Sequence, residues 1–235
     1  RVLFRLAVVW NLGEENTNTD AQRKAFAAHL KALDPYDHPV VVHTFPSKIA
    51  EVYEPLLGDA GIDGASLQTN DTVRQTRTWI ERSRAAGRPW VVSLDEIGPA
   101  DTGAKPDRDD YQHEGIRREH LWPHLMSGGA GVEWLFGYKY AHHDINLEDF
   151  RSRNHLWDLT RYAVVDFFQQ HLPFAEMEPA NELTPRDDDY VLAQAGTCYA
   201  LYLPKATLTE LDLPQGRFTV HWFDPRHGGE LHTGS

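Results

Sequence analysis

Residues 6–16 read Leu-Ala-Val-Val-Trp-Asn-Leu-Gly-Glu-Glu-Asn, a short apolar run that ends in two adjacent carboxylates. Such a run, closed by Gly and polar residues, predicts a buried parallel strand with Glu14 and Glu15 at its carboxyl end. Residues 89–98 repeat the design as Pro-Trp-Val-Val-Ser-Leu-Asp-Glu-Ile-Gly, with Glu96 where that strand should end. Enzymes built on parallel sheets place their reactive groups at this end of the strands. The two stretches therefore predict one site with two acids.

Strand and helix patterns alternate over residues 1–175, which predicts a mostly parallel sheet with right-handed crossovers. We expect strands over 40–45, 64–69, 89–97 and 132–138, and helices over 20–33, 47–57, 71–86, 111–126 and 147–171. Five such units suit the C-terminal half of a (β/α)8 TIM-type barrel, because a whole barrel takes about 250 residues. A half barrel exposes its edges, so we expect a missing N-terminal segment or a second chain to complete it.

The alternation stops after residue 175, and a different domain is predicted from there on. Residues 176–189 form a linker rich in Pro and acidic residues. Residues 190–235 carry only β signals, separated by Gly and Pro turns, with strands expected over 190–194, 197–203, 206–213 and 216–223. The fold class predicted for the chain is therefore α/β, a partial barrel followed by a small antiparallel β-sandwich.

The composition excludes several classes of protein. The chain has 235 residues, 41% of them hydrophobic, which is typical of a globular protein with a sizeable core. A net charge of -12 without a basic stripe argues against nucleic acid as a partner. No apolar run approaches the roughly 20 residues that span a bilayer, so no membrane partner is expected. A single cysteine, Cys198, rules out an internal disulfide and is interpreted as a small buried side chain.

The compartment is not predicted by the first residues, which lack the layout of a signal peptide. Since the chain opens almost inside a strand, we expect its natural start to lie further upstream, which would favour a secreted or periplasmic protein. No phosphate-cradling Gly motif and no Gly-x-Ser-x-Gly elbow occurs, and no cofactor is expected.

Three of these stretches resemble one enzyme clan. Residues 10–16, 91–98 and 134–138 are similar to the fourth, seventh and eighth strands of the barrels of clan A glycoside hydrolases. The tail, with residues 199–205 and 222–229, resembles the small β domain classed as collagen-binding that follows such barrels in apiosidase-like bacterial proteins. The resemblance covers nearly the whole chain, and the tail motif is the more specific part.

The resemblance implies a glycosidase that hydrolyses a polysaccharide or oligosaccharide by a retaining mechanism with two carboxylates. In that clan the acid/base Glu closes the fourth strand after an Asn, and the nucleophile Glu closes the seventh. Glu15 matches the acid/base and Glu96 the nucleophile. Glu14 stands where the clan has the Asn that holds the sugar 2-hydroxyl, which leaves open whether Glu14 or Glu15 is the acid/base.

Further side chains are candidates for binding the sugar. Trp134 and Tyr138 could form an aromatic platform, or they could fill the core of the barrel. His43 ends a strand and could line the site, or it could be a core histidine. The substrate-binding candidates are Glu14, Asn16, His43, Trp134 and Tyr138.

Two other functions stay open at this stage. One is a non-catalytic protein that binds a carbohydrate or a protein and uses the barrel remnant as a scaffold, its acids being solvated strand ends. The other is a lyase or metal hydrolase that uses His43 or His142. His142, His143 and Asp144 have the chemistry of metal ligands but lack a zinc spacing motif, so no metal is expected.

Overall fold

The computed structural model describes residues 8–13, 15, 17–146 and 148–234, and the chain forms two compact units. The first unit is Arg1–Gly98 with Gly129–Trp134, and the second is Pro99–Gly128 with Leu135–Ser235. No helix of the described residues is long and apolar enough to cross a membrane.

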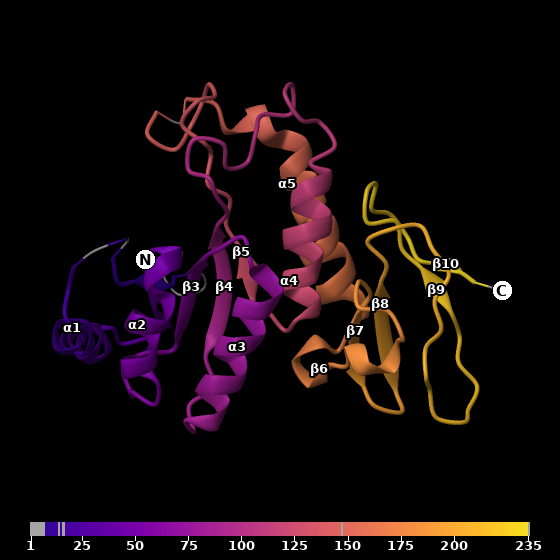
Figure 1. Ribbon diagram of the computed structural model, residues 1–235, viewed down its shortest axis with the longest axis horizontal. Helices are drawn as coiled ribbons and strands as arrows, with labels where there is room; N and C mark the ends of the chain where they lie inside the picture. Colours follow the sequence, from indigo (N-terminus) through magenta and orange to yellow (C-terminus); the bar gives the residue numbers. More distant parts are fainter. Residues whose placement is uncertain (1–7, 14, 16, 147, 235) are drawn as a thin grey trace. The chain divides into compact units, whose positions relative to one another are not determined.

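A five-stranded parallel sheet is the centre of the first unit (Figure 1). Its strands are β1 (Trp10–Asn11), β2 (Val40–His43), β3 (Gly64–Gln68), β4 (Val91–Glu96) and β5 (Gly131–Val132). Each strand pairs in parallel with the next one along the chain, so the order in the sheet equals the order in the sequence. The predicted α/β class and the parallel sheet are confirmed.

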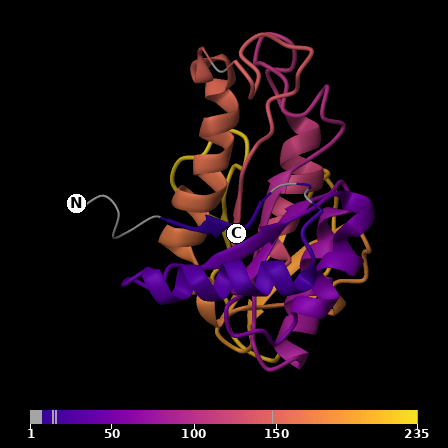
Figure 2. The same cartoon turned by 90° about the vertical axis from the view of Figure 1, so that its left-hand side faces the viewer.

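Helices connect the first four strands. They are α1 (Asp20–Leu33), η2 (Pro46–Lys48), α2 (Ile49–Tyr53), η3 (Glu54–Leu56) and α3 (Thr72–Ala85). Figure 2 shows α1 along its whole length. It begins with a capping box, because Thr19 Oγ1 accepts from the Gln22 backbone and the Gln22 side chain accepts from the Thr19 backbone. The helices predicted over 20–33 and 71–86 are confirmed to within a residue of each end.

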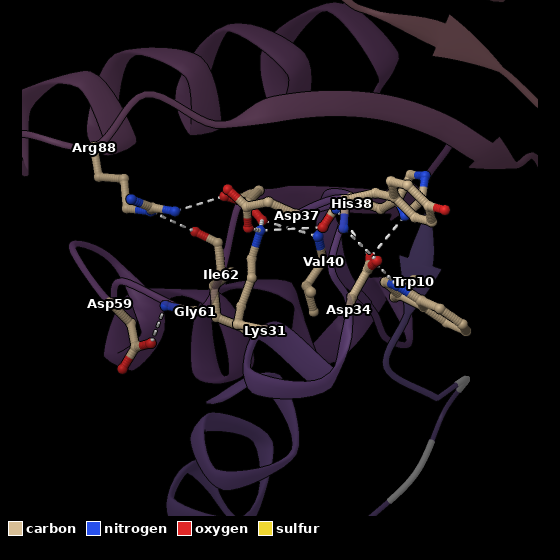
Figure 3. A network of polar contacts seen from close by, with 12 residues as sticks. Trp10, Lys31, Asp34, Asp37, His38, Val40, Asp59, Gly61, Ile62 and Arg88 are labelled. Atoms are coloured by element: carbon tan, nitrogen blue, oxygen red, sulfur yellow. Dashed lines mark hydrogen bonds and ion pairs between the residues drawn. The ribbon is translucent and has the colours of Figure 1, made fainter. Parts of the chain in front are cut away.

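The amino-terminal ends of the strands are joined by a polar network (Figure 3). Asp63, just before β3, accepts hydrogen bonds from the backbone of Val40 at 2.9 Å and from Arg88 at 2.6 Å. Lys31 of α1 lies 2.7 Å from the same carboxylate. One side chain therefore ties a helix to the beginnings of three strands. The network lies at the ends of the strands opposite Glu96, and we assign it a role in the stability of the sheet.

Asp63→Asn is expected to lower the free energy of unfolding by about 2 kcal/mol near neutral pH, because hydrogen bonds to charged groups are the stronger ones. Burial alone would raise the pKa of Asp63, but Lys31, the Val40 amide and Arg88 lower it further than burial raises it. The stability that the ionised carboxylate contributes is present above its unfolded pKa of about 3.9 and is lost as the pH falls through the lower folded value. Urea unfolding between pH 2 and pH 7 measures this.

The matched control is Asp37→Asn. Asp37 also contacts Lys31, at 2.7 Å, but its side chain is 82% exposed. Exposed ion pairs contribute little, so this variant should change stability by less than about 0.5 kcal/mol. Equal losses in the two variants, or a loss in Asp63→Asn that persists at pH 2, would contradict the role given to Asp63.

The second unit contains two small antiparallel sheets. One consists of β6 (Glu178–Pro179), β7 (Tyr190–Gln194) and β8 (Cys198–Tyr202), and the other of β9 (His221–Trp222) and β10 (His232–Thr233). Its helices are η4 (Ile116–Leu121), α4 (Trp122–Met126), η5 (Phe150–Arg153), α5 (Asn154–Arg161), η6 (Tyr162–Gln169), η7 (Phe174–Glu176) and η8 (Asn181–Leu183). The segment expected to be a linker thus contributes β6, which pairs with β7.

Two predicted strands differ in the structure, one being much shorter and the other absent from the described residues. The strand expected over 132–138 is only β5, because the chain then pairs with a loop: Gly103 bridges Phe136, and the Ala104 amide donates to the Leu135 carbonyl at 2.7 Å. Residues 206–213 alternate in polarity, yet the described structure has no strand there, and Leu208 is 94% exposed. Polarity alternation was insufficient because a strand also needs a partner.

Arg153 organises the loops of the second unit from a fully buried position. Its guanidinium donates to three backbone carbonyls, those of Ala104 at 3.3 Å, Ala141 at 3.0 Å and His142 at 2.8 Å. It also lies over the ring of Phe136, 4.3 Å from the centroid. A single cation therefore holds segments that have no regular secondary structure of their own.

Candidate functional site

Polar side chains share one face of the parallel sheet. In the strand register, Asn11 is opposite Val41, and His43 is opposite Ser66. Because side chains alternate along a strand and register partners share a face, Asn11, His43 and Ser66 lie on the same face. The other face is apolar and fully buried, through Val40, Val42, Ala65, Leu67, Val92 and Leu94.

A β-bulge brings Glu96 onto this polar face. The register runs Leu67 to Leu94 and then shifts, so that Gln68 is opposite Glu96 and not Asp95. An inserted residue of this kind redirects the side chains that follow it, and bulges are frequent next to active sites. Glu96 therefore lies on the same face as Gln68, at the carboxyl end of β4.

Among the described residues, two buried side chains lie next to the Glu96 carboxylate, and one of them donates a hydrogen bond to it. Gln68 Nε2 donates to Glu96 Oε1 at 2.6 Å, and His43 Nε2 lies 3.8 Å from Glu96 Oε2. The Glu96 side chain is 16% exposed, so its carboxylate is largely but not completely withdrawn from solvent. A carboxylate in such a place is fixed in orientation, as a nucleophile or a general base requires.

Hydrogen bonds fix the His43 ring through Nδ1, the nitrogen that is not next to Glu96. His43 Nδ1 lies 2.8 Å from Ser66 Oγ, and Asn11 Nδ2 donates to the same oxygen at 3.1 Å. His43 and Ser66 are both buried. Asn11, Ser66 and Gln68 were not predicted as site residues. The signal that could have found them is their position at alternate residues of neighbouring strands, on the face that carries His43.

Tyr53 of α2 supports the strand that carries Ser66. Its hydroxyl donates to the backbone carbonyl of Ser66 at 2.8 Å in a fully buried place. Burial raises the pKa of Tyr53 well above its usual value, and the charge of Asp95 raises it further. Tyr53 therefore stays neutral and acts as a rigid donor that holds Ser66 in position.

The two predicted acids differ in how the structure places them. Glu96 is part of the polar cluster, whereas Glu15 is exposed in the segment after β1 and is not among the described contacts of Glu96. Glu15 has a φ of 48°, and Gly13 before it has a φ of 73°. Glu14 and Asn16, the other candidates of this stretch, lie outside the described residues.

The two aromatic candidates lie in different units. Trp134 follows β5 in the first unit and is 4% exposed. Tyr138 belongs to the second unit, is 47% exposed, and meets His143 edge-on at a centroid distance of 6.1 Å. The aromatic platform therefore stays a prediction.

Two other features of the described residues bear on ligand binding. Among the described residues, no group of three or more His, Cys, Asp or Glu side chains is arranged to hold a metal ion. A hollow in the second unit is lined by residues 182–185 and 210–212, none of which was a predicted site residue. The polar cluster of the parallel sheet is thus the best-formed candidate site.

Comparisons with known proteins identify no relative: no family model, no curated protein and no solved structure matches the chain. The class of protein that the fold and the site define is an α/β protein with a polar, carboxylate-bearing cluster at the carboxyl edge of a parallel sheet.

Proposed function

We propose that this chain is a glycoside hydrolase in which Glu96 is the nucleophile and Glu15 the acid/base. The observation that carries the proposal is the Glu96 carboxylate, which projects from the end of a parallel strand and is held by Gln68 at 2.6 Å with His43 3.8 Å away. Hydrolysis of a glycosidic bond needs such an oriented carboxylate beside the anomeric carbon.

The sheet order supports a (β/α)8 barrel as the parent fold. Strands that pair in sequence order, all parallel, are the arrangement found in barrels, whereas doubly wound sheets reverse their order at a switch point. We propose that the sheet forms part of such a barrel and that the antiparallel strands after residue 176 belong to an accessory β-sandwich. The substrate of this proposed enzyme is a polysaccharide or oligosaccharide.

The reaction proceeds in two steps in this proposal. Glu96 attacks the anomeric carbon while Glu15 gives its proton to the departing oxygen, which leaves a glycosyl ester on Glu96. Glu15, now ionised, takes a proton from water, and the resulting hydroxide attacks the same carbon and releases Glu96. The configuration of the sugar is retained because two inversions occur.

The backbone conformation of Glu15 supports its assignment as the acid/base over the alternative of a solvated strand-end residue. A Glu in the left-handed region is strained by about 1 kcal/mol or more, and such strain concentrates at functional sites.

A trapping experiment tests the proposal. The protein is incubated with a set of 2-deoxy-2-fluoro aryl glycosides that covers the common neutral sugars, and the intact mass is recorded. We expect one reagent to add a single glycosyl group, and peptide mapping to place it on Glu96. A modified residue other than Glu96 would overturn the assignment. The absence of any adduct, together with no hydrolysis of an oligosaccharide panel, would overturn the proposed function.

Glu15→Gln is expected to slow hydrolysis of natural glycosides by about 10²–10⁴-fold, because the leaving oxygen then departs without a proton. Aryl glycosides with an acidic leaving group should be hydrolysed in the first step at close to the normal rate, since they need little protonation. The ratio of the two rates is the measurement. Glu14→Gln is the matched control, and if that variant shows the selective loss, Glu14 is the acid/base.

A further inference from the structure

Among the described residues, the Ser66 hydroxyl has one hydrogen-bond acceptor within reach. Within the described residues Ser66 Oγ has two hydrogen-bond neighbours, Asn11 Nδ2 and His43 Nδ1. An amide nitrogen donates and cannot accept, and Ser66 is fully buried. The hydroxyl therefore donates to His43 Nδ1, and a neutral His43 carries its proton on Nε2.

This tautomer directs an N–H toward the Glu96 carboxylate without pairing with it. The distance from His43 Nε2 to Glu96 Oε2 is 3.8 Å, which is longer than a hydrogen bond. His43 is 3% exposed, and among the described residues Nε2 has no hydrogen-bond partner. A buried donor of this kind destabilises the protein until something accepts its proton.

Gln68 leaves the complementary group unpaired on the same face. Its Nε2 is engaged by Glu96 Oε1, which fixes the amide, and its Oε1 is buried without a hydrogen-bond partner among the described residues. Gln68 is 8% exposed. The cluster thus holds one unmet donor, His43 Nε2–H, and one unmet acceptor, Gln68 Oε1, which both flank Glu96.

We propose that His43 Nε2–H and Gln68 Oε1 are a receptor for a hydroxyl group of a neutral sugar, and that Asn11 and Ser66 are the positioning residues that set the donor. A hydroxyl both accepts and donates, so one hydroxyl, or two on adjacent carbons, satisfies both groups. This inference rests on the proposed function, because it names the substrate class of the same site.

A charged sugar fits the receptor poorly. The carboxylate of a uronic acid only accepts, so it could bind His43 Nε2–H but would leave Gln68 Oε1 unpaired. It would also stand close to the Glu96 carboxylate in a site of low exposure, where like charges repel strongly. The receptor therefore selects neutral sugars against their uronic acids.

The first test measures the tautomer and needs no substrate. Long-range proton–nitrogen-15 correlation spectra show which ring nitrogen carries the proton, and comparison with His43→Gln assigns His43 among the 13 histidines. We expect the Nε2–H form. Asn11→Asp should switch His43 to the Nδ1–H form, because a carboxylate only accepts and so takes the Ser66 proton. Ser93→Ala, which lies on the same face one strand further, should leave the tautomer unchanged.

An Nδ1–H form in the wild-type protein, or an Asn11→Asp variant that keeps Nε2–H, would overturn the role given to Asn11 and Ser66. Either result can occur whether or not the protein hydrolyses glycosides. The tautomer test therefore fails separately from the proposed function.

The second test measures binding. Neutral monosaccharides and their uronic acids, glucose with glucuronate and galactose with galacturonate, are titrated while the His43 ring signals are followed. We expect a neutral sugar to shift Nε2–H and to bind at least about tenfold more tightly than its uronic acid. Gln68→Met, which removes the acceptor at similar size, should weaken that sugar about tenfold, as the loss of about 1.4 kcal/mol implies.

Two outcomes overturn the receptor. Preference for a uronic acid, in a protein whose Glu96 is trapped by a fluoroglycoside, would overturn it and leave the proposed function intact. No shift of His43 with any of these sugars would also overturn it, and trapping at Glu96 then decides separately whether the protein is a glycosidase.

Discussion

Arg153→Met is expected to lower the free energy of unfolding of the second unit by about 3–5 kcal/mol, because three hydrogen bonds from a charged group are lost at about 1.5 kcal/mol each. Met keeps most of the volume but donates no hydrogen bond. The carbonyls of Ala104, Ala141 and His142 would each lose a donor, and the loss is largest at Ala104, the one of these three residues that is buried.

The buried cation is compensated by its surroundings. Burial lowers the pKa of Arg153, while Asp144 and Asp107 act in the opposite direction. The ring of Phe136 adds a cation–π contact at 4.3 Å. Since an Arg side chain stays protonated in proteins, the loss in Arg153→Met should be independent of pH between 5 and 9.

Arg151→Met is the matched control, two residues earlier. Its guanidinium is exposed, and within the described part of the chain it forms an ion pair with Asp149, so its removal should cost less than about 0.5 kcal/mol. Urea unfolding measures both variants, and hydrogen exchange at residues 103–105 and 141–145 should accelerate in Arg153→Met only. A loss below 1 kcal/mol in Arg153→Met would show that the loops hold without the cation.

The sequence was sufficient for elements whose signals are local. Residues 40–43 and 64–68 are short and apolar or small, and both are fully buried strands in the structure. Thr19 and Gln22 mark the start of α1, because together they form a capping box within four residues. Such patterns depend only on residues close in the sequence, so these elements can be predicted without knowledge of the tertiary structure.

The arrangement of the candidate site and of the loops of the second unit depends on contacts between residues far apart in the sequence, which no local pattern encodes. The bulge that turns Glu96 onto the face of Gln68 exists only in the pairing of two strands 28 residues apart. The Asn11–Ser66 contact joins residues 55 positions apart. Arg153 lies within the helix predicted over 147–171, where no local pattern distinguishes it, yet its side chain is fully buried.

Glu96→Gln is expected to lower kcat for glycoside hydrolysis by about 10⁴-fold or more, the scale seen when a nucleophile is removed. The amide oxygen of the new side chain can still accept from Gln68, so the cluster should stay assembled and the fold intact. Substrate binding should change little, because the loss falls on the reacting atom and not on the groups that hold the sugar. Steady-state kinetics with the best glycoside of the panel measure this, and single-turnover analysis should show no glycosyl-enzyme.

Asp95→Asn is the control next to it in the chain. The bulge places Gln68 opposite Glu96, so Asp95 is not a member of the cluster and its variant should keep activity to within about threefold. Glu96→Ala adds a positive readout: the space left by the shorter side chain admits azide, which attacks the anomeric carbon once and yields a glycosyl azide of inverted configuration. If Asp95→Asn lost activity and Glu96→Gln kept it, the assignment of Glu96 as the nucleophile would be wrong, and the nucleophile would be Asp95.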